Sequence, residues 1–128
     1  MKTLVVIDDE PAITEVLRLV LEDEGYRVAV AHNGQAGLRL IREEHPDLVL
    51  SDVMMPGIGG IELARRVHRD PGLKDTPVVL MSAGRGPGRD TEGLCRAFVH
   101  KPFSLDTVLG VISQQIRRTR PDRPAPAN

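Results

Sequence analysis

Five short apolar runs, separated by segments with helical spacing, constrain the fold of this chain more than any other feature. The runs are TLVVI, RVAVA, DLVLS, PVVLM and AFVH, at residues 3–7, 27–31, 47–51, 77–81 and 97–100. Strands that are apolar on both faces are typical of a parallel sheet covered on both sides. The helical spacing is clearest in residues 13–21 and 105–116, where apolar side chains recur every three or four positions.

Strands that alternate with helices and connect by right-handed crossovers can be arranged in few ways. We therefore expect a three-layer α/β sandwich, for which 128 residues suffice as one domain. Gly37 falls inside the second expected helix and costs it roughly 0.5–1 kcal/mol relative to alanine. Residues 119–128 are rich in proline without apolar periodicity, which predicts a flexible tail or the start of a linker after a domain at 1–118.

The overall charge and hydropathy of the chain exclude some classes of partner. A formal net charge of −1 provides no overall basic field, so direct binding of nucleic acid is not expected. There is neither a secretory leader nor an apolar run of about 18 residues, so we expect no membrane insertion and a cytoplasmic location. Cys95 is the only cysteine, which rules out an internal disulfide.

Polar residues follow four of the five expected strands. Asp8 and Asp9 follow the first, Asp52 the third, Ser82 the fourth and Lys101 the fifth. Ligands of an open parallel sheet bind beyond the carboxyl ends of its strands, near the point where strand order reverses. Each residue also has an ordinary structural explanation: a helix cap for Asp9, a turn for Asp52, a loop hydroxyl for Ser82 and a solvated charge for Lys101.

Taken together, these residues predict a magnesium site that supports phosphoryl transfer. Three carboxylates at one edge repel each other and resist ionisation unless a cation joins them, and Mg²⁺ prefers such oxygen ligands. A bound Mg²⁺ usually keeps some waters and accepts phosphate oxygens. Asp52 can then act as a nucleophile that forms an aspartyl phosphate, while Lys101 and Ser82 neutralise and orient the phosphoryl oxygens.

Four motifs resemble those of the receiver domain of two-component response regulators, in its stand-alone, single-domain form. They are DDE at 8–10, DLVLSDVMMPGIGG at 47–60, VVLMSA at 78–83 and FVHKPF at 98–103. The resemblance extends from about Lys2 to Arg118. It implies a flavodoxin-like five-stranded parallel sheet with the strand order 2-1-3-4-5.

The resemblance also implies roles for individual residues at the magnesium site. Asp52 becomes the phosphoacceptor, and Asp8, Asp9 and Asp52 hold Mg²⁺ together with the backbone carbonyl of Met54. In the family, the hydroxyl and lysine residues that match Ser82 and Lys101 sense the phosphoryl group.

Two further expectations come from the resemblance alone. Phe98 matches the aromatic switch residue that changes rotamer when the hydroxyl of Ser82 is drawn toward the phosphoryl group, although plain core packing explains an aromatic residue there equally well. A cis peptide bond is expected between Lys101 and Pro102.

The chain departs from the family between Ser82 and Lys101, where it is shorter and richer in glycine and proline. Four glycines and a proline in residues 84–93 oppose a helix, so the fourth helix should be shortened or irregular. We expect this segment to be mobile and to become more ordered when Asp52 is phosphorylated. Because the fourth helix belongs to the family's output face, the departure also puts the usual partner surface in doubt.

The sequence therefore predicts a phosphorylation-dependent signalling receiver. Asp52 is expected to take a phosphoryl group from a sensor histidine kinase or a phosphotransfer protein, in a Mg²⁺-dependent reaction, and to switch binding to a downstream protein target. On this view the chain is no enzyme beyond catalysing its own phosphorylation and dephosphorylation. The alternatives are a receiver excised from a larger regulator or hybrid kinase, a phosphate-independent scaffold and a metal-dependent phosphohydrolase. A flavodoxin-like redox protein is disfavoured because the acidic first loop lacks a Ser/Thr-rich phosphate cradle.

Overall fold

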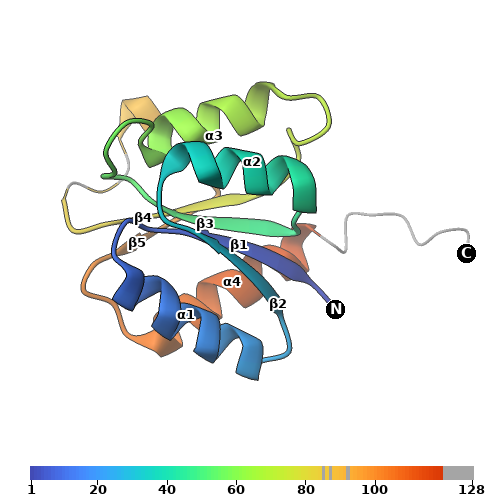
Figure 1. Ribbon diagram of the computed structural model, residues 1–128, viewed down its shortest axis with the longest axis vertical. Coiled ribbons are helices and arrows are strands. Elements are labelled where there is room, and N and C mark those ends of the chain that lie inside the picture. The colour runs from blue at the N-terminus through green and yellow to red at the C-terminus, as the bar shows by residue number, and fades with distance from the viewer. Residues whose placement is uncertain (85, 87, 92, 120–128) are drawn as a thin grey trace, which may run out of the picture.

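In the computed structural model, a five-stranded parallel sheet lies between two layers of helices (Figure 1). The structure describes residues 1–84, 86, 88–91 and 93–119. The elements, in chain order, are β1 (Thr3–Ile7), α1 (Pro11–Asp23), β2 (Arg27–Ala31), α2 (Gly34–Glu44), β3 (Leu48–Asp52), α3 (Gly60–Arg69), β4 (Val78–Ser82), the 3₁₀ turn η1 (Arg89–Thr91), β5 (Ala97–His100) and α4 (Leu105–Thr119).

The strand order is β2-β1-β3-β4-β5, which confirms the predicted flavodoxin-like sheet. The third and fourth strands begin and end one residue later than the sequence indicates. Pairing continues to Asp52, opposite Met81, and to Ser82, opposite His100. Both residues are therefore the last residues of their strands rather than the first residues after them, and the sheet itself fixes their positions.

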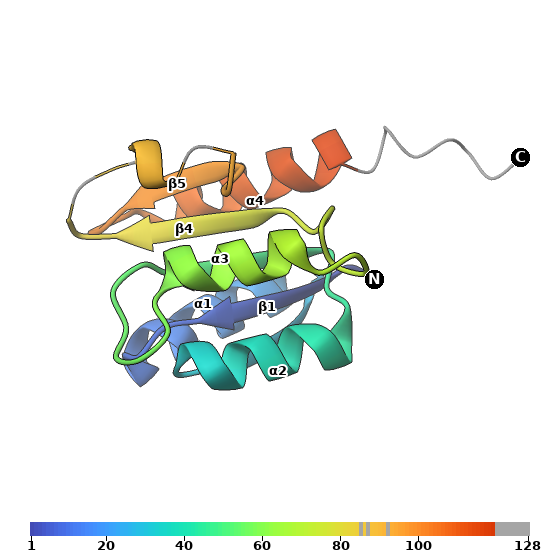
Figure 2. The ribbon, with the colours of Figure 1, turned by 90° about the horizontal axis from the view of Figure 1, so that it is seen from above.

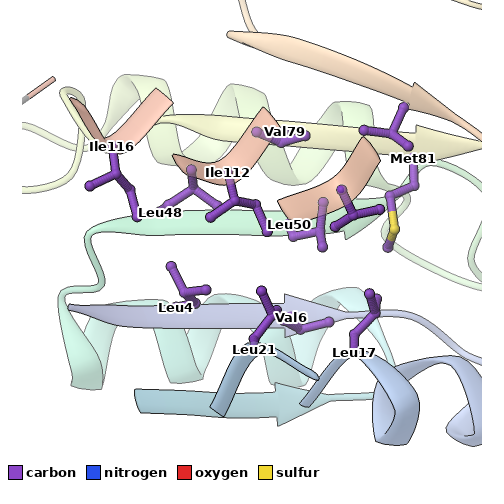
Figure 3. Packing of buried hydrophobic residues seen from close by; sticks show 12 residues of the cluster. Leu4, Val6, Leu17, Leu21, Leu48, Leu50, Val79, Met81, Ile112 and Ile116 are labelled. Atoms are coloured by element: carbon purple, nitrogen blue, oxygen red, sulfur yellow. The ribbon is translucent and has the colours of Figure 1, made fainter. Parts of the chain in front are cut away.

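Each face of the sheet packs against its own pair of helices, α1 and α4 on one side and α2 and α3 on the other (Figure 1). On the first side, leucine and isoleucine side chains of α1 and α4 point at the sheet (Figure 3). Alternate strand residues supply the two layers: Val6 belongs to the first cluster, and its neighbours Val5 and Ile7 belong to the second. Apolar burial on both faces accounts for the continuous apolar runs in the sequence.

The helix that contains Gly37 forms because α2 lies very close to β1. A Cβ atom on Gly37 would lie 2.5 Å from Cδ1 and 3.0 Å from Cγ1 of Ile7, so a larger residue would require the buried Ile7 side chain or the helix to shift. The start of α2 is capped by Asn33, whose side-chain oxygen accepts a hydrogen bond from the Ala36 amide at 2.8 Å. Close packing and the cap offset the low helix propensity of the glycine.

The interpretation of Asp9 as a helix cap is wrong. The N-cap residue of α1 is Glu10, which makes no side-chain capping bond, and Pro11 occupies the first turn. The Glu10 amide instead donates to Oδ1 of Asp8 at 2.9 Å. The chain turns into the helix around Asp8, which leaves the Asp9 side chain exposed beside it.

Among the described residues of the connection between β4 and β5 there is no α-helix and only the turn η1, as the glycine content predicts. The Thr91 hydroxyl closes this turn, because it accepts from the Gly88 amide and donates to the Gly88 carbonyl, both at 2.9 Å. Gly93 follows with φ +76°, a backbone conformation that favours glycine. Residues 85, 87 and 92 lie outside the described residues, so the expected mobility of 84–93 stays a prediction.

Two other expectations concern the membrane and the end of the chain. None of the described helices combines the length and the apolar character that a membrane span requires. Residues 120–128 of the predicted tail lie outside the described part of the chain, and the division at 118 stays a prediction.

Candidate functional site

The carboxyl ends of the strands lie along one edge of the sheet, because all the strands are parallel (Figure 2). This edge carries the five polar residues that follow the strands in the sequence: Asp8, Asp9, Asp52, Ser82 and Lys101. Asp52 and Ser82 are the last residues of their strands, Asp8 directly follows β1 and Lys101 directly follows β5. Asp9 comes next to Asp8 and completes the group.

Three carboxylates form the centre of the site. Oxygens of Asp8, Asp9 and Asp52 all lie within 4.8 Å of one another. Asp8 is fully buried and Asp52 is 5% exposed, whereas Asp9 lies at the surface. Negative charge is therefore concentrated at this edge of the sheet, and it is accessible to solvent on the side of Asp9.

Lys101 contacts two carboxylates of this cluster. Its Nζ donates to Oδ2 of Asp8 at 2.7 Å and lies 3.4 Å from Oδ2 of Asp52. The lysine side chain is 13% exposed, so this charge is largely withdrawn from water. Oε1 of Glu10 lies 3.8 Å from the same nitrogen, a neighbour that the sequence reasoning did not assign although it is the third residue of the DDE motif.

The surroundings shift the pKa values of the two groups that face each other across the site. Burial, followed by the negative charge of Asp8, raises the pKa of Asp52, and Lys101 opposes this rise only in part. Burial by itself lowers the pKa of Lys101, but the hydrogen bond and charge of Asp8, with the charge of Asp52, outweigh it and leave the pKa raised. The lysine is therefore held as a cation, while ionised Asp52 lacks full compensation.

Ser82 and Met54 both line one hollow at the carboxyl ends of β3 and β4. The Ser82 hydroxyl is buried and accepts a hydrogen bond from the Gly84 amide at 3.0 Å. The Met54 side chain is 71% exposed, and its backbone hydrogen bond to Asp52 lowers the pKa of that carboxyl slightly against the larger effects of burial. Arg89 of η1 also lines this hollow, and no sequence pattern indicated that position.

Two glycines fix the connection between β3 and α3 against the end of the strand. A Cβ atom on Gly60 would lie 2.3 Å from the Asp52 carbonyl oxygen, and one on Gly59 would lie 2.8 Å from that of Val53. The Gly60 amide donates to the Val53 carbonyl at 2.9 Å. The connection is thus folded back tightly on the residue that carries the central carboxylate.

Phe98 lies on β5, opposite Leu80 of β4, and is partly buried against the core under α2 and α3. Its ring centroid lies 5.2 Å from that of His100, with the planes tilted by 52°. This position is two residues before the partner of Ser82 in the sheet. The switch role of Phe98 stays a prediction. The Lys101–Pro102 bond is cis, which confirms the expectation from the resemblance.

The donor set of the site fits a hard divalent cation. Carboxylate oxygens are the side-chain ligands that Mg²⁺ takes in proteins, and a dication would relieve the repulsion between Asp8 and Asp52. Asp9 is exposed on the same cluster, so a metal bound there would retain water and remain accessible to a phosphoryl group. The arrangement brings three carboxylates that suit a cation and a largely buried ammonium within a few ångströms of one another.

The sequence matches the family described as the response regulator receiver domain over residues 4–113. Among characterised relatives, the phosphate regulon transcriptional regulatory protein PhoB of Pseudomonas aeruginosa is 37% identical over 98% of this chain and 56% of its own length. The DNA-binding response regulator MtrA of Mycolicibacterium smegmatis is 35% identical over 95% of this chain and 53% of its own length. The chain spans about half the length of these relatives.

Solved structures show the same architecture. The CheY-like response regulator receiver domain protein from Methanospirillum hungatei superposes with a TM-score of 0.88 at 23% identity, covering 96% of this chain and 99% of that one. The response regulator TrrA of Thermotoga maritima, determined in complex with Mg²⁺ and BeF, has a TM-score of 0.81 at 32% identity. It covers 90% of this chain and 99% of its own.

Proposed function

The chain belongs to the response regulator receiver domain family, and from this premise we propose that Asp52 accepts a phosphoryl group in a Mg²⁺-dependent reaction. The observation that supports this proposal best is the cluster of Asp8, Asp9 and Asp52 with Lys101 inserted between the two buried carboxylates. That geometry combines a metal-ligand set, a nucleophile and a counter-ion at one edge of the sheet. The related TrrA structure, which contains Mg²⁺ and BeF, is consistent with it.

The reaction transfers a phosphoryl group from a phosphohistidine to a carboxylate oxygen of Asp52. A P–O bond forms as the P–N bond breaks, and the histidine ring leaves with the electron pair of that bond. Asp8, Asp9, Asp52 and the Met54 carbonyl would hold Mg²⁺, which supplies charge neutralisation for the phosphoryl oxygens when bound. The raised pKa of Lys101 keeps it cationic, so it can shift from Asp52 to a phosphoryl oxygen.

Ser82 and Phe98 are the proposed sensors of the modification. Among the described residues, the Ser82 hydroxyl has a hydrogen bond only with the Gly84 amide, so a phosphoryl oxygen at Asp52 can compete for it. Movement of that hydroxyl would free space for the partly buried ring of Phe98. The consequence would be a shift in the population of two conformations of the β4–β5 side.

The partners follow from the chemistry of the proposed reaction. A sensor histidine kinase or a phosphotransfer protein would supply the phosphoryl group, and a downstream protein would respond to the modified form. We expect these encounters in the cytoplasm, and we expect residues 1–118 to suffice for them. The family match disfavours a phosphohydrolase or a flavin protein, and a phosphate-independent scaffold is the alternative that the next experiment addresses.

The direct test is the intact mass of the protein after incubation with acetyl phosphate and Mg²⁺. We expect one added phosphoryl group on the wild type and none on Asp52→Asn. Asp75→Asn is a matched control, because Asp75 is an exposed carboxylate away from the cluster. Labelling of Asp52→Asn equal to that of the wild type, or labelling that persists in excess chelator, would contradict the assignment, and an unlabelled wild type would favour the scaffold.

The metal-ligand role of Asp9 has its own test. Asp9→Ala removes the exposed oxygen ligand and should weaken Mg²⁺ binding by at least about tenfold without unfolding the chain. Mg²⁺ titration together with thermal melting measures both effects, and Glu24→Ala serves as the control for loss of one exposed carboxylate near α1. Equal Mg²⁺ affinity in Asp9→Ala and in the wild type would refute the role.

A further inference from the structure

Helices α2 and α3 lie side by side on the face of the sheet opposite α1 and α4 (Figures 1 and 2). A groove runs between them at the surface. Arginine side chains from both helices line it together with apolar residues and one carboxylate, and we call it the arginine groove: Gln35, Leu38, Arg39, Arg42, Glu43, Ile58 and Arg66. Nothing in the proposed phosphoryl transfer uses this surface.

The arginine groove carries positive charge that the described part of the chain leaves uncompensated. Arg39 and Arg42 are both exposed, and neither forms an ion pair or a side-chain hydrogen bond with another described residue. Nε of Arg66 forms an ion pair with Oε2 of Glu62 at 3.1 Å, but Oε1 of Glu62 also pairs with Arg65 at 3.5 Å. One carboxylate is thus shared by two guanidinium groups.

Favourable interaction with the helix dipole explains only part of this arrangement. Arg42 and Arg66 lie in the last turns of their helices, where a cation interacts favourably with the negative end of the dipole. Arg39 lies in the middle of α2, where the dipole gives no such benefit. It is three residues before Arg42, so the two guanidinium groups lie on the same face of the helix and repel each other unless an anion joins them.

The apolar part of the arginine groove indicates what kind of anion it suits. Leu38 is almost fully buried and Ile58 partly buried, so the arginines surround an apolar floor. The net charge of −1 provides no wider basic field for a continuous phosphate backbone. Carboxylates next to an apolar side chain match this combination better, because guanidinium groups bind carboxylates in bidentate geometry.

The arginine groove includes part of the connection between β3 and α3, the segment that also carries Met54. Ile58 belongs to the stretch between β3 and α3, and a Cβ atom on Gly34 would lie 2.2 Å from the Ile58 carbonyl oxygen. The start of α2 therefore rests directly on the backbone of this connection. A partner that occupies the arginine groove would contact the segment that leads away from Asp52.

From these observations we propose that the arginine groove is a docking site for an acidic segment of a partner protein, with an apolar side chain of that segment seated over Leu38 and Ile58. Arg39, Arg42 and Arg66 bind its carboxylates. The site is formed in the unmodified protein. It does not depend on phosphorylation of Asp52, so the two proposals can fail separately.

The test uses a fluorescent acidic peptide of sequence EELEDLEELE and measures its binding by anisotropy at low and at physiological salt. We expect weak, salt-sensitive binding by the wild type, and binding at least about tenfold weaker by the double variant Arg39→Glu/Arg42→Glu. The matched control Arg117→Glu/Arg118→Glu changes the net charge equally on α4, which lies on the other face of the sheet, and should bind the peptide nearly as well as the wild type. Circular dichroism checks that both variants are folded.

The peptide KKLKKLKKLK, with the charges reversed, and a single-stranded 12-mer of DNA complete the experiment. Neither should bind as well as the acidic peptide. The proposal is overturned if the wild type does not bind the acidic peptide, if both double variants lose binding equally, or if DNA binds more tightly than the peptide. Reduced binding by Ile58→Ala, whose side chain is only partly buried, at unchanged salt dependence would support the contact with an apolar side chain of the partner, and unchanged binding would remove that part of the proposal.

Discussion

Two connections leave the edge of the sheet that carries the carboxylate cluster, β3 to α3 and β4 to β5. Both are rich in glycine, but the space around their glycines differs. In the first, Gly59 and Gly60 lie against backbone carbonyl oxygens, where no Cβ atom fits. In the second, a Cβ on Gly84 would make only an ordinary 3.5 Å contact with the Ser82 hydroxyl. A Cβ on Gly86 would lie 3.0 Å from Cε1 of the His100 ring, which is a side chain and can move. Gly59 and Gly60 of the first connection are therefore held against backbone atoms, whereas Gly84 and Gly86 of the second face only side chains.

This difference separates the parts of the proposed mechanism. Asp52, the proposed phosphoacceptor, adjoins the closely packed connection, and Ser82, the proposed sensor, adjoins the other. A nucleophile benefits from a fixed position, because catalysis depends on preorganised geometry. A sensor benefits from low local stability, because a small change in free energy can then shift its population.

The strongest challenge to this comparison is to add one methyl group to each connection. Gly60→Ala places a Cβ 2.3 Å from the Asp52 carbonyl oxygen, so the backbone must move, and we expect a loss of about 2–3 kcal/mol in the free energy of unfolding. Gly84→Ala should change it by no more than about 0.5 kcal/mol. Urea denaturation of both variants measures the difference, and equal losses would show that the two connections are constrained alike.

A second prediction sharpens the difference in local stability. With beryllofluoride and Mg²⁺ bound as a phosphoryl mimic, amides of residues 84–98 should exchange more slowly, by an amount equivalent to about 1–3 kcal/mol. Amides that follow Gly60 in α3 should change much less beyond the direct effect of the ligand. Hydrogen exchange with mass spectrometry resolves both segments. Equal protection of 84–98 with and without the mimic would mean that the signal leaves the domain elsewhere.

The pH dependence of stability tests the uncompensated charge of Asp52. Its pKa is raised in the folded protein, so its contribution to stability is complete below the ordinary value of 3.8 and declines as the pH rises through the folded pKa. Asp52→Asn cannot ionise and escapes this loss. In metal-free buffer, the variant should therefore gain stability relative to the wild type between about pH 4 and pH 7.

Thermal melting of both proteins across this pH range provides the measurement. Asp75→Asn, an exposed carboxylate far from the cluster, should follow the wild type. A constant difference between Asp52→Asn and the wild type at every pH would show that Lys101 compensates Asp52 fully.

The smallest expected effect concerns Gly110, a glycine in a helix whose Cβ position is open. Gly110 is exposed in α4, with nothing within 4 Å of a built Cβ, so only helix propensity opposes its presence. Gly110→Ala should stabilise the protein by about 0.5–1 kcal/mol. The melting temperature checks the sign. A destabilised variant would indicate that this face of α4 makes a contact in solution.

The fold and the carboxylate cluster could be predicted largely from the sequence, whereas individual contacts could not. Apolar runs at a fixed spacing indicate buried strands whatever the detailed packing, and polar residues at their ends must meet at one edge of a parallel sheet. The cap assigned to Asp9 was wrong because local preference could not reveal that Asp8 already satisfies the Glu10 amide. Gly37 weakens a helix in isolation, and its close approach to Ile7 is a long-range contact.

The sequence by itself determined the layers, the strand order implied by the family motifs and the identity of the acidic residues, because these depend on local periodicity and on residue chemistry. Only the tertiary structure decided that Lys101 binds Asp8, 93 residues away, more closely than Asp52. It also decided that Arg66 of α3 faces Arg39 and Arg42 of α2 across one groove. Such pairings depend on how whole elements pack against the sheet, and the short-range pattern of the residues involved contains no signal for that packing.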